Sequence, residues 1–209
     1  MLEFTILISL NLGSTHCRIF GGESAELGQF PYQVSLREPQ YIHFCNGFII
    51  NSKWIGTSGN CATGRFARNV KAVLGAIDRF DSGVFFNVDK IFAHPEFDNP
   101  NKLNDIGLVL VNTEIFENDV IKRVPLGSEH VVSGSAVVSA WGRVDESSEY
   151  SEKLEFITVE VFDNEQCRQK LQETGHETEV HEQTICSITQ SGIGTCRGKS
   201  FNAVNHLFD

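Results

Sequence analysis

The sequence predicts an all-β protein built as a barrel or a sandwich. Short runs rich in valine, isoleucine and phenylalanine recur along the chain, and clusters of glycine, asparagine, aspartate and serine separate them. Only one segment carries a clear helix signal. Hydrophobic residues make up 41% of the 209 residues and charged residues 21%, which is typical of a globular protein with a sizeable core.

The expected strands fall into two sets along the chain. The first set covers 33–37, 44–50, 71–74, 84–92 and 106–111, and the second covers 135–141, 154–162 and 184–188. The single helix is expected at 164–171, with Asp163 as its N-cap and Gln166 as the capping-box partner. Two acidic, polar stretches, 145–152 and 172–182, are predicted to be solvated loops.

Charge and cysteine content narrow the class of protein. The net charge of −10 would repel a phosphate backbone, so nucleic-acid binding is not expected.

Residues 1–14 hold an apolar run that is too short to span a bilayer and predicts a secretory signal peptide. A buried first strand is the open alternative for this run, and no later segment predicts a membrane span. The six cysteines suggest disulfides in an oxidising compartment, although the number alone allows fifteen pairings.

A series of short motifs carries a more specific signal. In order they are RIFGG at 18–22, PYQVSL at 31–36, HFCNG at 43–47, TSGNC at 57–61, NDI at 104–106, WGR at 141–143 and GTCRGKS at 194–200. Each match is weak alone, but their order and spacing together resemble the chymotrypsin/trypsin-like serine proteases, peptidase family S1. The resemblance extends from residue 18 to the end of the chain.

The resemblance implies a fold and a maturation route. The fold is two six-stranded antiparallel β-barrels with the catalytic site between them, the first at about 19–120 and the second at about 121–209. Residues 1–18 would be the signal peptide and a short activation segment, and a secreted, extracellular zymogen would be cleaved after Arg18 to free Ile19. The implied disulfides are Cys45–Cys61 and Cys167–Cys186. Cys196 would be a free thiol and Cys17 has no clear partner, with a Cys17–Cys196 bond as the open alternative.

The resemblance also assigns the site residues. Ser200 stands at the position of the nucleophile, Asp105 at that of the orienting carboxylate and Asn60 at that of the base. The backbone amides of Gly198 and Ser200 would form the oxyanion hole. Gly194 would lie at the base of the specificity pocket and leave it neutral and apolar.

Three departures from the family pattern indicate lost activity. Asn60 replaces the histidine base, and an amide has no usable basicity. Lys199 replaces the acid that would pair with the freed ammonium of Ile19, so the activating ion pair is not expected to form. Phe201 and Asn202 replace two glycines, and the chain ends soon after Ser200, so the second barrel is expected to be incomplete.

The leading hypothesis is a secreted serine protease homologue that is catalytically inactive and binds protease inhibitors or peptide or protein substrates. One alternative is a working endopeptidase in which His43 or the substrate supplies the base. A second alternative is a truncated or frameshifted product without function. No cofactor or metal is expected, because His176 and His181 lie five residues apart and would point about 140° apart on a helix, the wrong spacing for a shared zinc.

Overall fold

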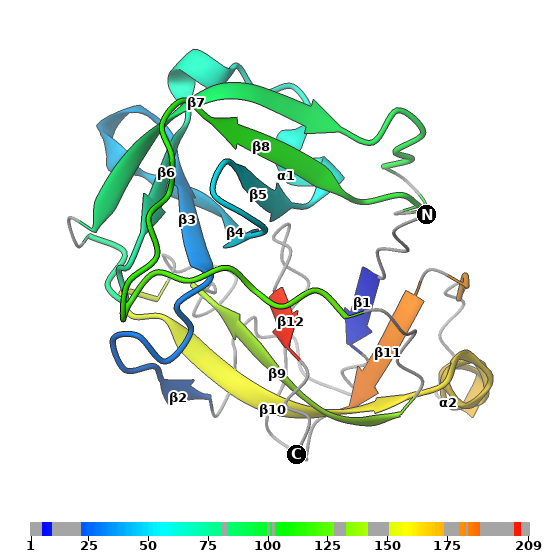
Figure 1. Ribbon diagram of the computed structural model, residues 1–209. Coiled ribbons are helices and arrows are strands. Elements are labelled where there is room, and N and C mark those ends of the chain that lie inside the picture. Colours follow the sequence, from blue (N-terminus) through cyan, green and yellow to red (C-terminus); the bar gives the residue numbers. More distant parts are fainter. Residues whose placement is uncertain are drawn as a thin grey trace.

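The computed structural model describes residues 6–9, 22–80, 83–99, 101, 103–127, 133–141, 151–173, 180–182, 184–188 and 203–205. Within these residues the chain forms a closed barrel and a second, six-stranded sheet, with a few short helices (Figure 1). The prediction of a mostly β protein with a barrel is confirmed.

The barrel is built from six strands in the spatial order β3-β4-β5-β8-β7-β6. Their bounds are β3 (Gln33–Arg37), β4 (His43–Ile49), β5 (Trp54–Thr57), β6 (Lys71–Leu74), β7 (Val84–Ala93) and β8 (Gly107–Val111). All neighbouring pairs are antiparallel, and β6 returns to pair with β3. Closure leaves no open sheet edge in this half of the molecule.

Five of these strands match predicted segments, and β5 does not. Its central Gly56 weakens the strand signal of a run of only four residues. The structure supplies a reason for that glycine, because a β-carbon at Gly56 would lie 2.3 Å from the ring of Phe48 on the neighbouring β4. The strand therefore depends on a contact between neighbouring strands that the local sequence does not show.

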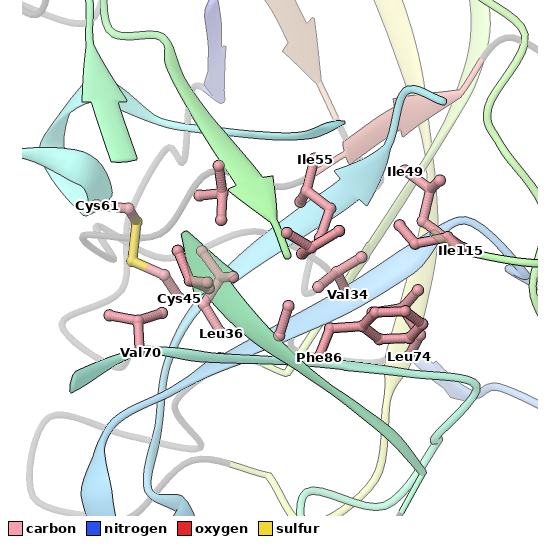
Figure 2. Close-up of a cluster of buried hydrophobic side chains, with 14 of the residues drawn as sticks. Val34, Leu36, Cys45, Ile49, Ile55, Cys61, Val70, Leu74, Phe86 and Ile115 are labelled. Carbon is pink, nitrogen blue, oxygen red and sulfur yellow. A yellow bond between two sulfur atoms is a disulfide. The ribbon is translucent and has the colours of Figure 1, made fainter. Parts of the chain in front are cut away.

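The barrel core consists of inward-facing aliphatic side chains. Val34 and Leu36 of β3 alternate with residues of the opposite face and lie in one cluster with Val109 and Val111 of β8. Figure 2 shows this cluster, with the Cys45–Cys61 disulfide at one side of it. Burial of each such side chain contributes about 1.5–3 kcal/mol, so this cluster is the main source of barrel stability.

The second sheet has the order β1-β11-β10-β9-β12, with β2 also paired to β10. Its strands are β1 (Ile6–Ser9), β2 (Glu23–Ser24), β9 (Gly134–Ala140), β10 (Glu155–Phe162), β11 (Thr184–Ile188) and β12 (Ala203–Asn205). The pair β1 and β11 is parallel, whereas an all-antiparallel barrel was expected. In the part of the chain that the structure describes, this sheet is open, with β1 and β12 at its ends.

The predicted helix is present as α2 (Asn164–Glu173). The carboxylate of Asp163 accepts a hydrogen bond from the Gln166 backbone N–H at 2.8 Å, as expected for an N-cap. The helix continues two residues past the predicted end, and its buried residues are Cys167 and Leu171, one turn apart.

Three shorter helical segments were not predicted. They are η1 (Pro39–Tyr41), α1 (Gly59–Ala62) and η2 (Ala67–Asn69). Among the described residues, no helix is long and apolar enough to cross a membrane.

Buried polar side chains join the barrel to the second sheet. Asn46 Oδ1 accepts hydrogen bonds from Gln33 Nε2 and from the Trp141 backbone N–H, both at 3.3 Å. The Ser139 hydroxyl on β9 donates to Gln33 Oε1 at 2.9 Å, and Trp141 Nε1 donates to the Ile77 carbonyl at 3.0 Å. Because buried polar groups are costly when unsatisfied, these bonds fix how the two assemblies sit against each other.

Candidate active site

The segment that follows β5 is a rigid loop and a single helical turn. Ser58 Oγ accepts a hydrogen bond from the Cys61 backbone N–H at 3.1 Å, which caps the first turn of α1. The Cys45–Cys61 disulfide ties the same turn to β4. Asn60 lies between these two anchors and is half-buried, so its position in the loop is well determined by the chain around it.

Asp105 lies beside the same loop and comes from the chain segment before β8. It precedes β8 and follows Asn104, whose φ of 52° lies in the left-handed region. Asn104 Nδ2 donates to the Glu96 carbonyl at 3.0 Å, which stabilises this turn. Asp105 Oδ1 then accepts a hydrogen bond from the Asn60 backbone N–H at 2.7 Å. The structure therefore brings together two residues that are 45 positions apart and that the sequence placed in one site.

A second polar cluster lies around His43 on β4. His43 Nδ1 is 2.8 Å from Ser35 Oγ, and Arg37 Nε donates to the same hydroxyl oxygen at 3.0 Å. The His43 ring lies 5.5 Å from the Trp141 ring, centroid to centroid. His43 is only 1% exposed, so it is enclosed where the barrel meets the second sheet.

The surroundings of His43 strongly disfavour its protonation. Burial, followed by the positive charges of Arg37 and Arg79, lowers the pKa of His43 from 6.5 to about 3. The imidazole is therefore neutral at physiological pH. Since the Ser35 oxygen accepts from Arg37, the serine proton is available for donation to Nδ1, which would place the imidazole proton on Nε2.

The remaining predicted site residues lie outside the described residues. They are Arg18, Ile19, Gly194, Gly198, Lys199 and Ser200. Cys17 and Cys196 also lie outside them, and so do His176, Phe201 and Asn202. Among the residues that the structure describes, no group of three or more His, Cys, Asp or Glu side chains is placed to hold a metal ion.

A model of the family described as Trypsin matches residues 19–200 of the chain. The chain belongs to the trypsin family of serine proteases. The family match covers all the barrel strands and the second sheet except β1 and β12, and it begins at the residue that follows Arg18.

Curated relatives carry the names of trypsins and chymotrypsins. The chain is 28% identical over 184 residues to Chymotrypsin-2 of Vespa crabro, an alignment that covers 87% of this chain and 80% of the relative. It is 30% identical over 193 residues to Trypsin-1 of Astacus astacus, with the same two coverages. It is 31% identical over 197 residues to Trypsin zeta of Drosophila melanogaster, covering 88% of this chain and 70% of that relative.

Two features of this trypsin-family chain differ in how well the sequence predicted them. The disulfides Cys45–Cys61 and Cys167–Cys186 are both present, and they are the two pairs that the family resemblance implied. The cluster of Ser35, Arg37 and His43 was not predicted from the sequence. Ser35 and Arg37 lie two positions apart on β3, so the sequence indicates that they face the same side of the strand. The position of His43 beside them depends on the pairing of β4 with β3, which is a tertiary contact.

Proposed function

We propose that this chain is a secreted serine protease homologue that binds peptide or protein ligands without hydrolysing them. Asn60 is the observation that carries the proposal. The chain around it resembles the loop that holds the catalytic base, and its backbone N–H bonds to Asp105. The loop and the orienting carboxylate are thus retained, while the side chain that would accept a proton is not.

The chemical consequence of Asn60 follows from its amide group. Acyl transfer by a serine hydroxyl needs a base within hydrogen-bond reach to take its proton. The asparagine amide can donate or accept a hydrogen bond but does not take up a proton near neutral pH. Loss of the base in such a site lowers turnover by roughly 10⁶-fold, or about 8 kcal/mol of barrier. Asp105 then has no imidazole to orient.

His43 is poorly suited to act as a substitute base. Its side chain is 1% exposed, which denies contact with a substrate. Its pKa of about 3 also makes it a much weaker base than an ordinary histidine. Both properties support inactivity over the alternative of a working endopeptidase.

Lys199 also supports the proposed inactivity, because it affects activation and not the base. In the pattern that the chain resembles, the residue before the nucleophile is a carboxylate that pairs with a new amino terminus, here Ile19. A lysine at this position brings two positive charges together in place of an ion pair. Cleavage after Arg18 would therefore not order an oxyanion hole at Gly198 and Ser200.

Secretion is proposed from the apolar amino-terminal run and from the disulfides. Two disulfides in the described residues suit an oxidising compartment. We propose that the leader ends before Arg18 and is removed on export. Expression in insect cells, followed by amino-terminal sequencing of the protein in the medium, tests this; protein retained in the cells with Met1 intact would contradict it.

Catalysis is tested with a fluorophosphonate probe and a peptide ester. We expect no labelling of Ser200 and no ester turnover by the wild-type chain, because neither base nor activation pair is present. The variants Asn60→His and Asn60→His/Lys199→Asp restore the two groups in turn, and the active fraction of the second is expected to exceed that of the first. Labelling of wild-type Ser200 together with ester turnover would refute the proposed inactivity.

Ligand binding is tested separately with a Kunitz-type protease inhibitor as the probe. Saturable binding by calorimetry is expected, without cleavage of the inhibitor on prolonged incubation. Absence of saturable binding to folded, monodisperse protein would remove the binding half of the proposal and leave the inactivity unaffected.

A further inference from the structure

The barrel segments 38–44, 65–71 and 85–87 present aromatic rings and positive charges together at the surface. Tyr41 is 60% exposed, Ile42 55% and Phe66 62%. Large apolar side chains that are exposed as a group on a soluble protein mark contact sites. We call this surface the basic aromatic face, and it consists of Tyr41, Ile42, Arg65, Phe66, Arg68 and Phe85.

Tyr41 is held against the outer surface of β7. Its ring meets the ring of Phe85 edge to face, with 5.2 Å between the centroids. Arg37 Cζ lies 5.9 Å from the centroid of the same Phe85 ring. β3, β6 and β7 lie side by side in the barrel, and Lys71 of β6 is the register partner of both Arg37 and Asn87 (Figure 1). The aromatic pair is therefore backed by two cations of the barrel wall.

The loop that presents Tyr41 has an uncommon backbone conformation. Gln40 and Tyr41 both have positive φ, 67° and 63°, which residues with a side chain adopt only at a cost. The Tyr41 backbone N–H donates to the Glu38 carbonyl at 3.0 Å, and the Glu38 N–H donates to the Ile42 carbonyl at 2.9 Å. The chain thus holds a strained loop that exposes an aromatic ring, a combination that is typical of functional surfaces.

Two arginines extend the face beyond this loop. Arg65 pairs with Glu38, and its guanidinium lies over the Phe44 ring at 4.2 Å. The Arg68 guanidinium lies over the exposed Phe66 ring at 5.0 Å. A guanidinium stacked on a ring presents the N–H groups of its edge to a carboxylate. The two arginines are therefore ordered at the surface by aromatic contacts.

The face is positive although the chain as a whole is acidic. Residues 39–77 contain four basic residues and no aspartate or glutamate, whereas the whole chain has 27 acidic residues and a net charge of −10. Glu38 borders the face, and further along β7 the exposed Asp89 and Lys90 offset each other. The local potential thus has the opposite sign to that of the chain and attracts carboxylates.

We propose that the basic aromatic face binds an extended acidic segment of a partner protein, in which carboxylates are interspersed with leucine, isoleucine or phenylalanine. Arg65 and Arg68 pair with the carboxylates in the forked geometry that a guanidinium favours. The apolar side chains of the segment cover Tyr41, Ile42 and Phe66. A sulfated polysaccharide would satisfy the charges, but it has no apolar side chains to cover the rings.

The test uses the full chain and a fluorescent synthetic peptide in which pairs of glutamates alternate with pairs of leucine or phenylalanine. Because neighbouring side chains of an extended segment point to opposite sides, pairs place both kinds of side chain on each face of the peptide. Fluorescence anisotropy is expected to show saturable binding that weakens when NaCl is raised from about 50 mM to about 500 mM. Two control peptides replace every glutamate with glutamine, or every leucine and phenylalanine with serine. Each is expected to bind about ten-fold more weakly or worse.

A charge variant and its matched control locate the site of peptide binding. Arg65→Gln/Arg68→Gln removes two exposed arginines and is expected to weaken binding about ten-fold. Lys122→Gln/Arg123→Gln removes the same charge from another exposed segment, where Arg123 also has a carboxylate neighbour in Glu117. This control is expected to change the affinity less than about two-fold, since distant surface charges are screened.

An aromatic variant tests the apolar half of the proposal. Tyr41→Asn/Phe66→Ser removes two exposed rings, and asparagine tolerates the left-handed backbone at residue 41. Its binding is expected to be about ten-fold weaker, whereas Phe116→Ser/Leu126→Ser, exposed elsewhere, should leave the affinity unchanged. Thermal unfolding checks that every variant is folded, and the peptide series on the wild-type chain tests the proposal without any substitution.

Three results would overturn the proposal. They are absence of saturable peptide binding, equal effects of a variant and its matched control, and equal affinities for the three peptides. A sulfated polysaccharide that binds through Arg65 and Arg68 while the acidic peptide does not would also overturn it. The outcome is separable from the proposed inactivity, because none of these substitutions alters Asn60 or Asp105. Ester turnover together with peptide binding would refute only the inactivity.

Discussion

Acidification should destabilise this protein through His43. The folded pKa of His43 is about 3, whereas the usual value for the unfolded chain is 6.5. The unfolded state therefore takes up a proton first as pH falls, and stability is lost progressively from about pH 6.5 toward pH 3. At pH 5 the native imidazole is still neutral, while that of the unfolded chain is largely protonated. At about 1.4 kcal/mol per pH unit, the interval from 6.5 to 5 gives a loss of about 2 kcal/mol.

The assay is urea unfolding at pH 7 and pH 5, compared between wild type and His43→Gln. Glutamine does not titrate, and its side chain can keep a hydrogen bond to Ser35. Carboxylates elsewhere contribute to both proteins, so the difference between their pH responses isolates His43. We expect the wild-type chain to lose about 2 kcal/mol more than the variant between the two pH values.

An equal loss in the two proteins would refute the reasoning. Should the variant not fold, the wild-type chain still allows the test, because the ring protons of His43 can be followed by NMR. A His43 resonance that titrates near pH 6 in the folded protein would contradict the effect of burial and of the neighbouring Arg37 and Arg79.

Three further variants test two contacts beside the candidate site and the disulfide between α2 and β11. Gly107→Ala would place a methyl group 2.9 Å from the carbonyl oxygen of Ser58, and thermal unfolding should reveal a loss of about 1–3 kcal/mol; an unchanged midpoint would contradict the close packing. Ser58→Ala removes the acceptor for the Cys61 N–H and should cost about 1 kcal/mol in urea unfolding, with Ser58→Thr, which keeps a hydroxyl, as the control. The double variant Cys167→Ser/Cys186→Ser opens a loop of sequence separation 19 and should lose about 3 kcal/mol in urea unfolding, a prediction that fails if the variant has the wild-type midpoint.

The strands show how far the sequence alone could go. Short runs rich in valine, isoleucine and leucine between turn residues predicted β3 and β8 almost to the residue, because residue composition is a local property of the chain. β5 was not predicted because Gly56 weakens the strand signal. The glycine is needed because a β-carbon there would clash with the ring of Phe48, which lies on another strand. The parallel pairing of β1 with β11 could not be predicted either, since it joins the start of the chain to a strand near residue 186.

Some features of the candidate site could also be predicted from the sequence, whereas others depend on the fold. The residue types at 60 and 105 were readable from the sequence, and so was the lack of basicity at residue 60, because an asparagine side chain lacks basicity in any fold. The family was also readable from the order of the motifs, since that order depends only on which residues are present.

Only the tertiary structure decided what His43 is. In the sequence it was a possible substitute base; enclosed beside Arg37 and Trp141 it is a neutral side chain where the barrel meets the second sheet. Residue identity determines what a group can do in water. Burial and the charges that folding brings near it determine its protonation, and those depend on contacts that no local pattern encodes.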